Sequence, residues 1–201
     1  MNKNSLFENT LVLSLPHRED RQAASVQELK KLDIDYNFFP AVNGHEIEVK
    51  QPLLPGEYGI KLSHIQILRE AIKNKLESVF IFEDDIVLHN SVSEILERNY
   101  EFLTDAQFIY LGGSHRGPIT HVGGDVYQAG DLYTTHAMWI HNSMFSEIIE
   151  TLQFHPFHQL DNCYVFLQKK YRCLTIYPNI AYQKDGYSDI QNKLVSYEWL
   201  K

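Results

Sequence analysis

Residues 79–88 combine a strongly apolar run with three consecutive acids. Residues 79–82 are apolar without alternation, Glu83, Asp84 and Asp85 follow, and residues 86–88 are apolar again. An apolar run without alternation is typical of a strand that is covered on both faces, as in a parallel or mixed α/β sheet. Such sheets bind ligands beyond their strand ends. The stretch therefore predicts a buried strand with carboxylates at its tip, beside a ligand site.

The three acids also indicate what such a site would bind. Adjacent carboxylates repel one another and are costly to bury unless a cation compensates them, so a divalent metal ion is their natural partner. The alternative is an acidic turn that faces water, because acids are mostly exposed in folded proteins. The apolar sequence on both sides of Glu83, Asp84 and Asp85 favours the metal site.

Composition limits the class of protein. A chain of 201 residues with 44% hydrophobic content can bury one sizeable core, so we expect a single domain over residues 1–201. The net charge of -8 argues against a general nucleic-acid binder, although it is compatible with a local basic pocket for phosphate. Two cysteines make neither a disulfide framework nor a zinc site, and we expect both to be reduced.

The sequence also bears on location. The first ten residues are polar, and no apolar run reaches the length that spans a membrane. We therefore expect a cytoplasmic protein without an integral membrane segment. A peripheral position at the inner membrane surface is compatible with the same sequence.

Apolar periodicity predicts alternating strands and helices, the pattern of an α/β fold. The expected strands are residues 11–15, 36–39, 79–82, 108–111, 134–140 and 174–177, and the expected helices lie near residues 22–32, 60–76, 92–103, 143–152 and 161–168. Residues 114–131 are interpreted as a glycine-rich loop, and residues 178–192 as a polar segment after the last strand. The standard dinucleotide, P-loop, serine-hydrolase and zincin motifs are absent from the sequence, so it gives no cue for those classes.

Arg18 and Arg21 lie in the turn between the first strand and the helix that follows. In an α/β fold such a turn faces the ligand crevice, and helix N-termini favour anions, so both arginines are candidates to bind a phosphate or a nucleotide. A solvated turn in which the arginines pair with Glu19 and Asp20 explains the same residues equally well.

Several other polar residues have a local structural explanation beside a functional one. Ser63 and His64 lie in the first turns of a predicted helix, where a side chain can cap backbone donors or reach a neighbouring loop, and a structural role is favoured for His64. Asp161 opens an apolar segment either as a cap or helix-dipole partner, or as a base that faces the crevice. His155 and His158 flank a proline without further ligands, and we interpret them as a loop.

Several short motifs together resemble glycosyltransferase family 25, which includes bacterial lipopolysaccharide and lipooligosaccharide galactosyltransferases and the procollagen galactosyltransferases. The motifs occur in the family's order along most of the chain, and the set is far more specific than any one member. They are residues 13–21, residues 39–44, Gly56 with Gly59, Ser63-His64, residues 83–85, residues 136–140, Asp161 and residues 188–190.

The resemblance implies a GT-A fold, which is a Rossmann-type three-layer α/β/α sandwich with a mixed, mostly parallel sheet. It also implies a UDP-sugar donor, usually UDP-galactose, and inversion at the anomeric carbon. The departing diphosphate gains negative charge, which Mn²⁺ or Mg²⁺ stabilises, and the family pattern assigns the ion to Asp85, with Glu83 in support. The expected donor contacts are Leu15, Arg18, Arg21, Asn43, Ser63, His64, Glu83, Asp84 and Ser188, and the expected base is Asp161, with Asp189 as second choice.

Two departures from the family pattern keep other functions open. The chain is short for the family, and no histidine follows His158, although GT-A enzymes often use a late histidine as a metal ligand; Asp189 is an alternative ligand. The alternatives are a sugar-nucleotide-binding module without transfer and a metal-dependent phosphohydrolase or nucleotidyltransferase. The acceptor can be a glycan, a lipid-linked saccharide or a protein hydroxyl, because acceptor loops carry no readable code.

Overall fold

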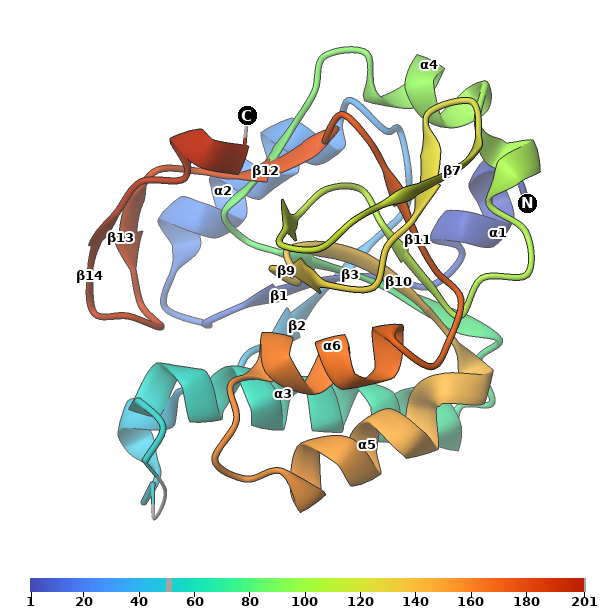
Figure 1. Ribbon diagram of the computed structural model, residues 1–201. Helices are drawn as coiled ribbons and strands as arrows, with labels where there is room; N and C mark the ends of the chain where they lie inside the picture. The colour runs from blue at the N-terminus through green and yellow to red at the C-terminus, as the bar shows by residue number, and fades with distance from the viewer. Residues whose placement is uncertain (50–51, 201) are drawn as a thin grey trace.

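The computed structural model describes residues 1–49 and 52–200, and its centre is an eight-stranded mixed sheet (Figure 1). Six of the eight strands run in one direction, whereas β10 and β8 run antiparallel to both of their neighbours. This confirms the predicted mixed, mostly parallel sheet. The order across the sheet is β2 (Asn37–Pro40), β1 (Thr10–Ser14), β3 (Ser78–Glu83), β10 (Ala137–His141), β5 (Phe108–Tyr110), β11 (Cys173–Ile176), β8 (Val126–Gln128) and β7 (Thr120–Gly123).

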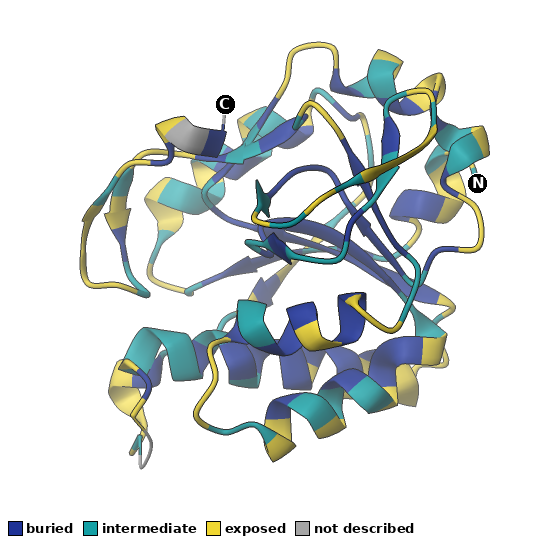
Figure 2. Cartoon of the chain, viewed as in Figure 1, coloured by how far each residue is buried: buried dark blue, intermediate teal, exposed yellow. Residues whose placement is uncertain are grey.

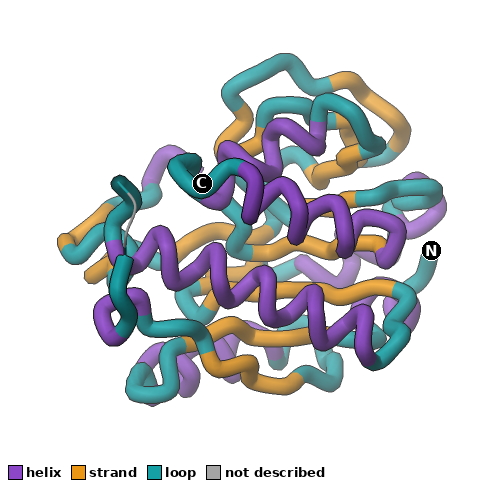
Figure 3. Tube along the Cα trace, turned by 90° about the horizontal axis from the view of Figure 1, so that it is seen from below, coloured by secondary structure: helices purple, strands orange, loops and turns teal. Residues whose placement is uncertain are grey.

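Helices cover both faces of the sheet, which gives the expected three layers. One face carries α1 (Lys3–Phe7), α2 (Glu19–Leu29) and α4 (Val92–Glu97), and the other carries α3 (Pro55–Lys73), α5 (Phe145–Phe154) and α6 (Leu160–Gln168). Figure 3 shows helices lying across one face of the strands, and Figure 2 shows that the strands between the helical layers are buried. Short 3₁₀ helices are η1 (Gly44–Glu46), η2 (Tyr100–Phe102), η3 (Asn142–Met144) and η4 (Glu198–Leu200).

Strand β3 has the two-sided burial that its sequence predicts. Val79 and Ile81 pack into the core beneath α3 and α5, whereas Phe80 and Phe82 pack into the core beneath α1 and α4. Successive side chains of a strand point to opposite faces, so a strand between two helical layers is apolar at every position. Each of the six residues of β3 is buried, and Glu83 is the last of them.

The acids mark the point where the chain leaves the main sheet. After a turn at Asp84 and Asp85, the resumed apolar run forms β4 (Ile86–Leu88), which pairs with β12 (Ala181–Gln183) in a separate two-stranded sheet. The prediction of carboxylates at the tip of a buried strand is thus confirmed. The pairing also brings the C-terminal part of the chain beside the acids.

Two segments contain strands that the sequence analysis did not predict. Residues 114–131 include β6 (Ser114–His115), β7 and β8, and β6 pairs with β9 (Leu132–Tyr133). Strand β11 is not the last strand, because β12 and the hairpin of β13 (Gly186–Ser188) and β14 (Lys193–Val195) follow. These strands are only two to four residues long. Such strands show little sequence periodicity and depend on their partners for stability.

Helix α3 begins at Pro55, earlier than its apolar periodicity indicates. Pro55 occupies the first turn, where a missing N–H costs nothing, and the Glu57 carboxylate accepts a hydrogen bond from the Leu54 N–H at 2.9 Å. The early start places Gly56 and Gly59 inside the helix, where Gly56 approaches Ile190 and Gly59 approaches Val42.

Cys163 and Cys173 are both buried and free, as expected. Over the described part of the chain, we find no helix with the length and apolar character needed to cross a membrane.

Candidate functional site

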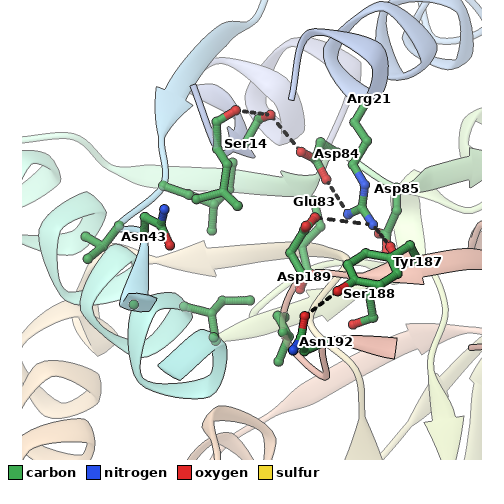
Figure 4. Close-up of a pocket in the computed structure, with 18 of the residues that line it drawn as sticks. Ser14, Arg21, Asn43, Glu83, Asp84, Asp85, Tyr187, Ser188, Asp189 and Asn192 are labelled. Carbon is green, nitrogen blue, oxygen red and sulfur yellow. Dashed lines mark hydrogen bonds and ion pairs between the residues drawn. The ribbon is translucent and has the colours of Figure 1, made fainter. Parts of the chain in front are cut away.

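A cavity of about 390 Å³ lies beyond the C-terminal ends of β1, β2 and β3, where parallel α/β sheets bind their ligands (Figure 4). The three strands are parallel neighbours, so the residues that follow them meet at one edge of the sheet. The predicted site residues that line this cavity are Leu15, Arg21, Asn43, Glu83, Asp84, Asp85, Ser188 and Asp189.

Asp84 is tied to the protein on both of its carboxylate oxygens. Ser14, at the end of β1, donates from Oγ to Oδ2 at 2.6 Å, and Arg21 donates from Nη1 to Oδ1 at 3.0 Å. Two such contacts hold the carboxylate in one position. Asp84 thus joins the end of β1 and the first turns of α2 to the turn after β3.

Glu83 and Asp85 lie in a less compensated environment. Burial, with repulsion from Asp85, raises the pKa of Glu83 to about 8, although its carboxylate accepts a hydrogen bond from Thr135 Oγ1 at 2.8 Å. Burial also raises the pKa of Asp85 to about 6 against the opposing effect of Arg21. Asp85 Oδ1 is buried and has no hydrogen-bond partner among the described residues, and Gln183 Nε2 lies 3.4 Å from Oδ2.

These two acids fit a hard divalent cation. Oxygen ligands suit Mg²⁺ and Mn²⁺, and Mg²⁺ is commonly held by one or two carboxylates with water and substrate phosphates as its other ligands. The unpartnered Oδ1 of Asp85 and the nearby Glu83 supply two such carboxylates. Within residues 1–49 and 52–200, no cluster of three or more histidine, cysteine or acidic residues forms a complete protein cage for a metal. The arrangement therefore suits an ion that a bound phosphate helps to hold.

The two arginines are engaged by acids at the edge of the cavity. Arg18 pairs with Asp20 at 3.0 Å and donates to Asp189, whereas Arg21 lies 3.6 Å from Asp189 and donates to the Tyr187 carbonyl. The pairing of Arg18 with Asp20 is the local contact that a solvated turn predicts. Arg18 does not line the cavity, whereas Arg21 points from α2 toward the acids (Figure 4).

Ser63 and His64 do not reach the cavity, which corrects the expectation that they contact a donor. Ser63 is fully buried, and its Oγ donates to the Gly59 carbonyl at 2.8 Å and accepts from the Val42 N–H at 2.9 Å. His64 is also fully buried, with Nδ1 2.9 Å from the Tyr164 hydroxyl, and burial lowers its pKa to about 3. Both are structural: α3 packs against the core through them, and Ser63 holds the loop after β2.

Close backbone contacts explain the Gly56-x-x-Gly59 motif. A Cβ on Gly56 would lie 2.4 Å from Ile190 Cα, and one on Gly59 would lie 2.5 Å from the Val42 carbonyl oxygen. A Cβ on Gly44 would lie 1.7 Å from the Pro55 carbonyl oxygen. These glycines let the loop after β2 and the segment after β13 pack against the start of α3, which shapes the cavity wall.

Asn43 lines the cavity, but its side chain is occupied within its own loop. Its Oδ1 accepts from the His45 N–H at 3.1 Å, and its Nδ2 donates to Glu46 Oε1 at 2.8 Å. The amide is therefore a cap of η1.

A second cavity of about 370 Å³ adjoins the first and contains Asp161. Both cavities share Glu83 on their walls. Asp161 lies in the first turn of α6 but makes no capping bond there; its carboxylate accepts from the Thr134 backbone instead. Burial raises its pKa to about 6, against smaller lowering effects of that bond and of Arg116. The two candidate bases are thus separated, with Asp189 in the first cavity and Asp161 in the second.

Several residues of the two cavities carry no local sequence signal. Thr135 and Gln183 contact Glu83 and Asp85, yet they come from the segment before β10 and from β12. Arg116, which follows the unpredicted β6, and Tyr133, which lies in the unpredicted β9, line the second cavity. Pairing of β4 with β12 and of β6 with β9 assembles these residues, and only the tertiary structure reveals that pairing.

The fold and the first cavity define an α/β protein with a carboxylate-rich ligand site beyond its parallel strands. The sequence profile of "Glycosyltransferase family 25 (LPS biosynthesis protein)" matches residues 7–128, which is more than half of the chain. The chain therefore belongs to glycosyltransferase family 25.

Curated relatives agree with this assignment. A putative glycosyltransferase of Haemophilus influenzae is 33% identical over 106 residues, which is 46% of this chain and 38% of the relative. Procollagen galactosyltransferase 2 of Mus musculus is 26% identical over 129 residues, which is 53% of this chain and 21% of the relative. Inactive glycosyltransferase 25 family member 3 of Mus musculus is 28% identical over 135 residues, 56% of this chain and 23% of the relative. The matched part is well under half of each relative's length.

Proposed function

We propose that this chain is a single-domain, metal-dependent inverting glycosyltransferase that moves a hexose from a UDP-sugar to an acceptor hydroxyl. The observation that carries the proposal is the adjacency of the two cavities at Glu83, with Asp85 in the first and Asp161 in the second. A donor in the first cavity and an acceptor in the second would meet at this shared wall. Galactose is the proposed sugar, because procollagen galactosyltransferases are among the relatives.

Asp85 and Glu83 would hold a Mn²⁺ or Mg²⁺ ion. Such an ion, when bound, neutralises the charge that develops on the departing diphosphate. Arg21 adds positive charge at the edge of the same cavity. Its orientation is fixed by the hydrogen bond from its Nη1 to Asp84 Oδ1, which is 3.0 Å long. Arg18 supports this arrangement through its ion pair with Asp189.

Asp161 is the proposed base. As the acceptor oxygen bonds to the anomeric carbon, Asp161 takes its proton, and the bond from that carbon to the diphosphate breaks on the opposite face. A carboxyl with a pKa of about 6 is mostly ionised at pH 7 and is a stronger base than an ordinary aspartate. Asp189 is less suited to this role, because Arg18 pairs with it and Arg21 lies 3.6 Å away.

The test is an assay of purified protein with UDP-galactose, UDP-glucose and UDP-N-acetylglucosamine, each with Mn²⁺, Mg²⁺ or a chelator. We expect metal-dependent release of UDP, fastest from UDP-galactose, and a product of inverted anomeric configuration by NMR when a glycan, lipid-linked saccharide or protein acceptor is supplied. UDP-sugar binding without turnover would instead indicate a binding module, as an inactive member occurs among the relatives. Absence of both binding and metal dependence would overturn the proposal.

A further inference from the structure

We propose that the second cavity recognises an anionic group, a carboxylate or a phosphate, on the acceptor saccharide, and that Arg116 binds it with help from Lys193. Both residues line this cavity and neither lines the first. The proposal rests on the proposed function in one respect, which is the assignment of the second cavity to the acceptor. It adds a substrate class and a specificity-determining residue.

Arg116 is positioned by a defined piece of backbone. Strands β6 and β9 pair immediately before it, with Ser114 opposite Tyr133, and the Arg116 N–H donates to the Asp131 carbonyl at 2.9 Å. The next residue, Gly117, approaches Asp131, the residue before β9, so closely that an added Cβ would lie 2.7 Å from Asp131 Cβ. The chain around Arg116 is therefore held against β9, although its side chain is exposed.

The guanidinium group of Arg116 is itself oriented. Its Cζ lies 4.1 Å from the centre of the Tyr133 ring, and Tyr133 also lines the cavity. Stacking on a ring uses one face of the guanidinium plane and leaves the N–H groups at its edge free. Edge N–H groups in this fixed geometry match the two oxygens of a carboxylate or a phosphate.

The charges in the cavity are unequally satisfied. No described residue makes an ion pair within 4.0 Å with Arg116 or Lys193, and no side-chain hydrogen bond joins either of them to the described residues. The acids on the same walls all have partners: Glu57 with Leu54 and Gln159, Glu83 with Thr135, and Asp161 with the Thr134 backbone. Among the described residues, Arg116 acts electrostatically on the Asp161 carboxyl but makes no ion pair, and Lys193 makes none. In a chain of net charge -8, these two cations beside one cavity are a local feature that suits an anion.

Binding experiments with matched sugars test this inference. The protein is first saturated with UDP and Mn²⁺, so that the first cavity is filled, and is then titrated with methyl glucoside, methyl glucuronide or glucose 6-phosphate by calorimetry or ligand-observed NMR. We expect the wild-type protein to bind at least one anionic sugar about tenfold more tightly than the neutral one. The two anionic probes distinguish a carboxylate ligand from a phosphate ligand.

The Arg116→Gln variant should lose this preference and bind all three sugars alike, and Lys193→Gln should reduce it. Arg69→Gln is the matched control, because Arg69 is exposed on α3 and lines neither cavity. The inference would be overturned if the wild-type protein bound the neutral and anionic sugars with equal affinity, or bound none of the three. It would also be overturned if Arg69→Gln reduced the preference for an anionic sugar as much as Arg116→Gln does. Failure of the proposed function is seen separately, as absence of UDP binding in the first step.

Discussion

The Arg21 guanidinium donates from Nη1 to Asp84 Oδ1 at 3.0 Å, and this contact joins α2 to the turn that follows β3. Both side chains are largely buried, with 19% and 9% of their surfaces exposed. Removing one partner of such a pair leaves the other charge without compensation. The contact therefore connects the stability of the fold to the geometry of the first cavity.

Replacement of Arg21 by glutamine should weaken both properties. We expect the free energy of unfolding to fall by about 1–3 kcal/mol, and the Kd for UDP to rise about tenfold, because a charged hydrogen bond and a cation beside the phosphates are both lost. Urea unfolding and calorimetry measure the two effects. Arg69→Gln removes the same charge from the exposed face of α3, and equal effects of the two variants would show that Arg21 acts only through net charge.

Asp161→Asn should separate donor binding from transfer. The variant removes the proposed base but leaves the first cavity intact, so UDP binding should be unchanged while transfer falls by about 10²- to 10⁴-fold. In the wild-type protein, transfer should rise with pH through about 6 as the carboxyl ionises. Unchanged transfer in the variant would remove Asp161 from the mechanism.

The same aspartate should carry a stability cost. Its folded pKa of about 6 lies above the ordinary value of 3.8, so the folded state holds a proton that the unfolded state releases between these two pH values. Its ionisation therefore lowers stability as pH rises from about 4 to about 6. Asp161→Asn should be more stable than wild type at pH 7 in urea unfolding, and equal stability of the two proteins at that pH would contradict this prediction.

Local sequence determines some parts of this molecule and not others. The apolar run before Glu83 predicts its own burial, because a strand between two helical layers has no polar side. Strands β7 and β8 show no such pattern, since they are only four and three residues long. At the site, the acids were predictable from their cost when buried. Thr135 and Gln183 were not, because long-range strand pairing brings them to the acids.

His64 illustrates a different limit. Its place in the family's motif suggested contact with the donor, whereas the structure buries it against Tyr164. A sequence motif marks the residue type at a position, but it does not show whether that side chain packs in the core or binds a ligand. Burial decides between these two, and the sequence around His64 does not specify that a helical layer covers it.

Gly44→Ala should be strongly destabilising. A Cβ at Gly44 would lie 1.7 Å from the Pro55 carbonyl oxygen, so the loop after β2 has to move away from α3. We expect a loss of about 1–3 kcal/mol or more in the free energy of unfolding, as for other overpacked sites, and weaker UDP binding. Gly130→Ala is the control, because a Cβ there meets nothing within 4 Å. A similar loss in both variants would refute this account of the glycine.

Two buried histidines should make the protein sensitive to acid. Burial lowers the pKa of His64 to about 3 and that of His136 to about 4, so each stays neutral in the folded state while the unfolded chain binds a proton below about 6.5. Each histidine should therefore lower the free energy of unfolding by up to about 1.4 kcal/mol for each pH unit below about 6.5. His64→Gln should flatten the decline between pH 7 and pH 5 in urea unfolding. An unchanged slope would contradict this prediction.

Asp85 is the proposed metal ligand of the donor site, so UDP release from UDP-galactose with Mn²⁺ should depend on its carboxylate. Asp85→Asn keeps the size of the side chain but replaces its carboxylate, whose Oδ1 has no partner among the described residues, with a neutral amide. Asp105→Asn is the control, because it removes an equal charge from an exposed turn. Asp105 has a φ of 57°, which asparagine tolerates well. We predict that Asp85→Asn abolishes metal-dependent UDP release while Asp105→Asn retains the wild-type rate. Equal release by Asp85→Asn and wild type would show that Asp85 holds no metal ion in the reaction.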